Sequence, residues 1–191
     1  FYNNYYRKNF AGAKTCTIRN WTDSIFKVDL KDDVLSTGGA SKSNIQDFIT
    51  VVNSKDQYKL NINSYIGRKI INNETKSGNV TFRVLKKDVN MKYETYYIEV
   101  ENNEDTDILL DNLDTAGTIY LQDKKQVKYS YINEGITKEL LRVKSKCKVQ
   151  IAIKFSDSYI SNRELTSIVF SKAQIENADS TTKEIKFEIK L

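Results

Sequence analysis

Strict alternation of apolar and polar residues recurs along this chain and constrains its fold more than any other feature. A β-strand turns successive side chains to opposite faces, so a period of two predicts half-buried strands. Val149-Gln-Ile-Ala-Ile-Lys-Phe155 and Ile185-Lys-Phe-Glu-Ile-Lys-Leu191 are clear examples. Segments with this alternation, or with a short apolar run typical of strands, are 25–30, 48–52, 58–62, 80–84, 97–100, 108–110, 127–131, 149–155, 168–170 and 185–191.

Turn-forming pairs such as Gly38-Gly39, Asn72-Asn73 and Ser77-Gly78 separate these runs. The segments 43–48 and 137–141 each fit a helical turn, but no long apolar stripe of helical period occurs. We therefore predict an all-β fold, a two-sheet antiparallel β-sandwich of jelly-roll or immunoglobulin-like kind. It should contain roughly nine to eleven strands and little helix.

A length of 191 residues suits one domain, and no repeat or Pro/Gly/Ser-rich linker divides the chain. We expect an N-terminal segment, 1–18, followed by a single sandwich domain, 19–191.

The chain contains no histidine, which excludes Ser-His-Asp and Cys-His nucleophile arrangements and histidine-ligated zinc. Two cysteines are too few for a zinc finger or an iron–sulfur site. No pair of carboxylates stands out as facing across a cleft. We expect a protein that is not an enzyme and that uses no cofactor.

The net charge of +5 raises the question of nucleic-acid binding. Lysine outnumbers arginine by 24 to 6, whereas bidentate recognition of phosphate and guanine favours arginine. We therefore expect no nucleic-acid partner. The chain begins with Phe1 rather than Met, and aromatic and then basic residues follow. From this start we predict a secreted or cell-surface protein that contacts a membrane only through a removed N-terminal signal or anchor.

Cys16 and Cys147 are the two cysteines. In an exported protein an even count favours a disulfide, which we predict between them. The alternative is a pair of buried free thiols.

Acidic residues are densest between Asn102 and Asp114. Asp105, Asp107 and Asp111 offer oxygen ligands of the kind that calcium prefers, although their spacing does not match an EF-hand loop. The favoured interpretation is a solvated loop between two strands, with these residues as a calcium candidate.

Five of the first ten residues are aromatic. In a strand, Tyr2, Tyr6 and Phe10 would share one face and would suit donation to the open sheet of another copy. An ordinary first strand, a membrane-boundary remnant and an aromatic platform for sugars or bases are the alternatives.

An apolar run is followed by Asn in Phe48-Ile-Thr-Val-Val-Asn53, and a late strand carries Ala-Gln in Ile168-Val-Phe-Ser-Lys-Ala-Gln174. With the processed start and the β-rich body, this pattern resembles the camelysin/TasA-like surface and biofilm-fibre proteins of Gram-positive bacteria. The resemblance implies a secreted sandwich that polymerises by donating its N-terminal strand. The metalloprotease activity described for some members does not fit a chain without histidine, and a disulfide is not part of the family pattern.

We expect a structural subunit of a fibre or self-assembling layer, with other copies of itself as partners. The alternatives are a secreted module that binds a glycan or a host protein, and a jelly-roll virion protein.

Overall fold

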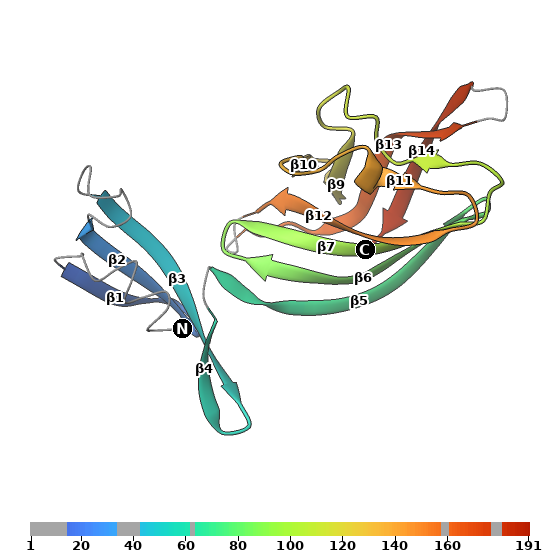
Figure 1. Cartoon of the computed structure of the whole chain (residues 1–191). Coiled ribbons are helices and arrows are strands. Elements are labelled where there is room, and N and C mark those ends of the chain that lie inside the picture. Colours follow the sequence, from blue (N-terminus) through green and yellow to red (C-terminus); the bar gives the residue numbers. More distant parts are fainter. Residues whose placement is uncertain (1–14, 34–42, 62–63, 158–160, 177–180) are drawn as a thin grey trace. The chain divides into compact units, whose positions relative to one another are not determined.

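The computed structural model describes residues 15–33, 43–61, 64–157, 161–176 and 181–191, and these form almost only β-strands (Figure 1). Two antiparallel sheets contain four and ten strands, so the predicted all-β fold with two antiparallel sheets is confirmed. The described residues form fourteen strands, more than expected, and a 3-10 turn at Glu139–Leu141. The finer choice between a jelly-roll and an immunoglobulin-like topology stays a prediction.

The four-stranded sheet follows the order of the chain. It contains β1 (Thr15–Thr22), β2 (Ile25–Asp33), β3 (Ser43–Ser54) and β4 (Gln57–Asn61), so that β1 and β4 are its edge strands.

The ten-stranded sheet runs in the order β11-β8-β13-β9-β10-β12-β7-β6-β5, with β14 paired to β13. Its strands are β5 (Tyr65–Ser77), β6 (Val80–Asn90), β7 (Tyr93–Asn102), β8 (Ile108–Leu109), β9 (Ile119–Asp123), β10 (Lys128–Ile132), β11 (Arg142–Val143), β12 (Lys148–Ser156), β13 (Leu165–Glu176) and β14 (Thr182–Lys190).

The chain divides into two compact units, Phe1–Ile66 and Gly67–Leu191, each described here by itself. This division lies far from the boundary between residues 18 and 19 expected from the sequence, which falls inside β1. The reason is local pairing: the first four strands pair only with one another in sequential order, whereas the strands from β5 onward belong to the other sheet.

In the first unit, both faces of the sheet bury apolar side chains, because the register places Val28 and Leu30 on one face and Ile25 and Phe48 on the other. Ile18 lies opposite Val28 across β1 and β2, and Val51 lies opposite Leu60 across β3 and β4. Residues directly opposite in an antiparallel pair share a face. Val28 is buried, but Ile18 and Leu60 at the two edges are 61% and 60% exposed. On the face that carries Val28, the apolar side chains Ile18 and Leu60 of the two edge strands are therefore exposed.

In the second unit, the sheet folds into two layers that enclose the core. β10 links the layers, because its Tyr131 and Ile132 pair with β12 and its residues 128–130 pair with β9. Phe82 of β6 packs against Phe187 of β14, with ring centroids 4.7 Å apart, and both rings are almost fully buried. These contacts between layers are the sandwich packing that alternation predicts.

All ten segments singled out from the sequence overlap strands of the structure. The 3-10 turn at Glu139–Leu141 confirms the helical turn predicted at 137–141. The helical turn predicted at 43–48 is wrong, because these residues belong to β3 and pair with β2. The turn predicted at Asn72-Asn73 is also wrong: both residues lie inside β5, where Asn72 adopts a φ of 56°.

Candidate functional site

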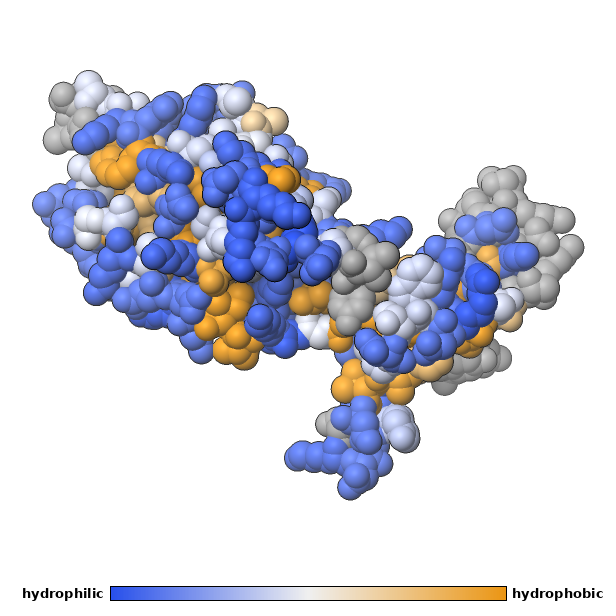
Figure 2. Space-filling view, turned by 180° about the vertical axis from the view of Figure 1, so that it is seen from behind, coloured by the Kyte–Doolittle hydropathy of each residue, from blue (hydrophilic) through white to orange (hydrophobic). Residues whose placement is uncertain are grey.

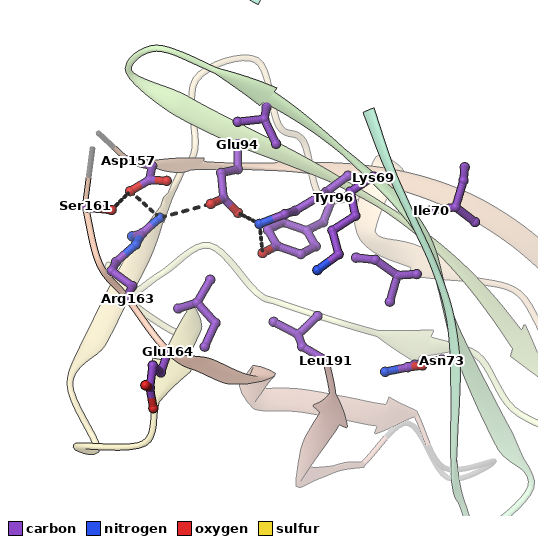
Figure 3. Close-up of a pocket in the computed structure, with 14 residues that line it drawn as sticks. Lys69, Ile70, Asn73, Glu94, Tyr96, Asp157, Ser161, Arg163, Glu164 and Leu191 are labelled. Atoms are coloured by element: carbon purple, nitrogen blue, oxygen red, sulfur yellow. Dashed lines mark hydrogen bonds and ion pairs between the residues drawn. The ribbon is translucent and has the colours of Figure 1, made fainter. Parts of the chain in front are cut away.

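A cavity of about 640 Å³ in the second unit gathers several ionisable side chains (Figure 3). They come from β5, β6, β7 and the segments that flank Asp157 and Arg163. We call Lys87, Glu94, Asp157 and Arg163 the charged cluster.

The backbone explains why Glu94 points inward. β7 alternates strictly, and Glu94 has the same parity as the buried residues Tyr96, Ile98 and Val100. A strand places residues of equal parity on one face, so Glu94 must face the interior. Its side chain is 6% exposed.

A bulge in β6 brings Lys87 to the same place. Before the bulge, Phe82 and Val84 face the core, and the register then shifts between Val84 and Lys86. The shift places Lys87 opposite Tyr96 and Lys86 opposite Tyr97. An extra residue in one strand moves the side chains that follow it to the opposite face. Lys87 therefore points inward, although the core-facing residues before the bulge, Phe82 and Val84, have even numbers.

Two carboxylates converge on one guanidinium group in this cluster (Figure 3). Arg163 Nη2 lies 2.8 Å from Asp157 Oδ1 and 3.6 Å from Glu94 Oε1. Lys87 Nζ lies 3.0 Å from the other oxygen of Glu94. The hydroxyl of Ser161 donates a hydrogen bond of 2.5 Å to Asp157 Oδ1. The cluster thus alternates charge and holds its members together by paired contacts.

Arg163 is nearly enclosed but incompletely hydrogen-bonded. Its side chain is 9% exposed, its Nη1 donates to the carbonyl oxygen of Ser156, and its guanidinium lies 4.5 Å from the ring centre of Tyr129. Nε and Nη2 are buried without a hydrogen-bond partner among the described residues. The short approach of Nη2 to Asp157 is therefore an ion pair that falls short of hydrogen-bond geometry, and buried donors of this kind favour an added acceptor.

The two carboxyl groups differ in acidity. Burial, and then the hydrogen bond with Glu94, raise the pKa of Asp157 above its ordinary value. Burial opposes ionisation of Glu94, but hydrogen bonds with Asp157 and Tyr96 and the charge of Lys87 hold its pKa below the ordinary value. Asp157 is therefore the weaker acid of the two, and as pH falls it takes up a proton before Glu94 does.

The structure does not bring the calcium candidates together. Asp105 pairs with Lys146, and Asp107 pairs with Lys144 and accepts a hydrogen bond from the Ser145 N–H. Asp111 is buried and accepts hydrogen bonds from Thr118 and Tyr131. Within the described ranges, no group of three or more His, Cys, Asp or Glu side chains is arranged to hold a metal ion.

The predicted disulfide is absent, and the alternative of buried thiols is also wrong. Cys16 in β1 belongs to the first unit and Cys147 before β12 belongs to the second, and both thiols are free and exposed. Each side chain points to solvent from its own unit, where no partner sulfur is bonded to it. The assembly residues Tyr2, Tyr6 and Phe10 lie outside the described residues.

The edge strand β4 is the second candidate surface. Gln57 to Leu60 are all exposed, and Tyr58 and Leu60, with 79% and 60% exposure, share one face of the strand. Figure 2 shows hydrophobic surface at the base of the β3–β4 hairpin. An exposed edge with apolar side chains is a site where another strand can pair.

No family model, curated protein or solved structure matches the chain. The resemblance to camelysin/TasA-like proteins therefore stays a prediction. In the part of the chain that is described, no helix has the length and apolar character needed to cross a membrane.

Proposed function

We propose that this protein is a structural subunit that assembles by adding a strand of one copy to the β4 edge of the next. The observation that carries the proposal is the exposed apolar pair Tyr58 and Leu60 on this edge strand. A strand that pairs along β4 would supply both main-chain hydrogen bonds and apolar cover for these side chains.

Strand composition supports this function. Natural edge strands are usually protected by short length, proline, bulges or charged side chains, lysine above all. The chain has no proline, and β4 pairs with β3 from Gln57 to Asn61 without a register shift. Lys59 is the charged residue on β4, and it has the opposite parity to Tyr58 and Leu60, so it leaves their face apolar.

The donor in this proposal is the segment before Thr15. Part of the segment 1–18 is already paired in its own chain, because Thr15 to Ile18 lie opposite Val28 to Lys31 of β2. The segment before Thr15 carries the aromatic side chains Tyr2, Tyr6 and Phe10, which would cover the apolar face of β4. The exported or surface location stays a prediction.

Electron microscopy of negatively stained full-length protein tests the proposal. We expect polymers from the wild type, and we expect Leu60→Lys to prevent them because a charge would be placed in the paired interface. Leu140→Lys is the matched control, since Leu140 is 58% exposed in the 3-10 turn and belongs to the second unit. The triple variant Tyr2→Ser, Tyr6→Ser, Phe10→Ser should also fail to polymerise. Monodisperse wild-type protein, or polymers in all variants, would refute the proposal.

A further inference from the structure

We propose that the cavity of the second unit is a binding site for a neutral polyhydroxylated ligand, a sugar. This inference concerns the charged cluster and does not depend on assembly through β4. The cavity has a volume of about 640 Å³, which lies in the range of small-molecule sites, roughly 300–1,000 Å³.

The charges of the cavity wall exclude a preference for ions. Lys69, Lys87 and Arg163 are matched by Glu94, Asp157 and Glu164. An anion in the cavity would be attracted by the basic groups but repelled by the nearby carboxylates. A cation would be attracted by the carboxylates but repelled by the basic groups. A neutral ligand meets neither penalty.

The hydrogen-bonding groups match hydroxyls. Arg163 has a buried Nε that makes no hydrogen bond and a buried Nη2 that contacts Asp157 and Glu94 only as an ion pair, while Glu94 offers a carboxylate that accepts. Since an alcohol donates one hydrogen bond and accepts others, a single ligand hydroxyl can satisfy both groups at once. Arg163 and Glu94 are both more than nine-tenths buried, so these groups are held in place before a ligand enters.

The remaining wall suits the carbon skeleton of a sugar ring. Ile71, Val89, Leu165 and Leu191 line the cavity together with Tyr96. Figure 3 shows Leu191 and Tyr96 facing the space beside the charged cluster. A pyranose has C–H faces that pack on apolar side chains and a rim of hydroxyls that needs polar partners, which is the division found here.

Saturation-transfer NMR on the full-length protein, with glucose, galactose, mannose, N-acetylglucosamine and cellobiose as probes, tests the inference. Glucuronate, glucosamine and inorganic phosphate are the charged comparisons. We expect saturable binding of at least one neutral sugar and no binding of the ions. If cellobiose binds more tightly than glucose, the ligand is a chain of sugar units. If glucose binds as tightly as cellobiose, the ligand is a free sugar.

Arg163→Lys should weaken the binding about tenfold or more, because a lysine cannot replace both guanidinium donors. Arg83→Lys is the matched control, since Arg83 makes ion pairs with Glu74 and Glu99 on the outer face and should leave affinity unchanged. Should Arg163→Lys fail to fold, amide shifts in the wild type near Tyr96 and Leu165 decide instead. No saturable sugar, binding of the ions alone, or shifts confined to other regions would overturn the inference.

Discussion

Lys87 Nζ lies 3.0 Å from Glu94 Oε2, and the two side chains reach this contact from neighbouring strands on the inner face of the sandwich. Glu94 also faces Arg163, so a single acidic side chain neutralises two largely buried cations. The interior of the second unit therefore contains the charged cluster beside its apolar core.

Replacing Glu94 by Ala should destabilise the protein strongly, because it leaves Lys87 and Arg163 without this charge. Removing one partner of a buried ion pair costs roughly 3–5 kcal/mol. The check is the free energy of unfolding in urea. Glu99→Ala is the control on the same strand: Glu99 faces outward, pairs with Arg83 and Lys148, and should lose about 1 kcal/mol or less. Equal losses in both variants would contradict the account.

Asp157→Asn should change the pH dependence of stability. The raised pKa means that folded Asp157 holds a proton above pH 3.8, its ordinary pKa, where the unfolded chain has released it. Stability from this residue is complete below that value and is lost as pH rises through the raised pKa. Asn does not titrate there, so the variant should gain stability relative to wild type as pH increases above about 4. Melting temperatures across a pH series measure this, and a difference that stays constant with pH would contradict the assignment.

Asn102 organises the loop after β7. Its side chain is fully buried, and Nδ2 lies 2.9, 3.1 and 3.2 Å from the carbonyl oxygens of Thr106, Val143 and Lys144. Its Oδ1 accepts from the N–H of Glu104. Asn102→Ala should therefore lower the free energy of unfolding by roughly 1–3 kcal/mol, since buried backbone groups lose their partners.

Asn102→Asp should be comparably unstable, because it keeps the acceptor but loses the donors. Asn133→Ala, at an exposed position, is the control and should change stability by no more than about 0.5 kcal/mol. A stable Asn102→Ala variant would show that the loop does not need these contacts.

Both cysteines should react with iodoacetamide in the native, unreduced protein, because both thiols are exposed and unbonded. Intact mass should show two added groups. An unmodified mass that gains both groups only after reduction would restore the disulfide predicted from the sequence.

The strands were predictable where alternation is clean, as in β12 and β14, because burial on one face fixes side-chain parity. β5 escaped detection because Asn72-Asn73 has turn chemistry, and pairing within the sheet overrides it. β9 escaped because all five of its residues are buried and its polar members, Gln122 and Asp123, break any simple pattern.

One feature of the sequence indicates the charged cluster. Glu94 occupies a core-facing parity in Tyr93-Glu-Thr-Tyr-Tyr-Ile-Glu-Val100, where an apolar residue is expected. A buried carboxylate is costly unless a basic group pairs with it, so Glu94 predicts a basic side chain nearby in the interior. The partners themselves were not predictable, since the bulge that turns Lys87 inward and the loop that carries Arg163 depend on tertiary pairing.

Amide hydrogen exchange at β4, followed over a series of protein concentrations, tests the proposed assembly most directly. Strand addition should slow exchange of the amides from Gln57 to Asn61 as concentration rises, and Leu60→Lys should remove this protection while Leu140→Lys keeps it. Exchange at β4 that is independent of concentration would contradict the proposed function.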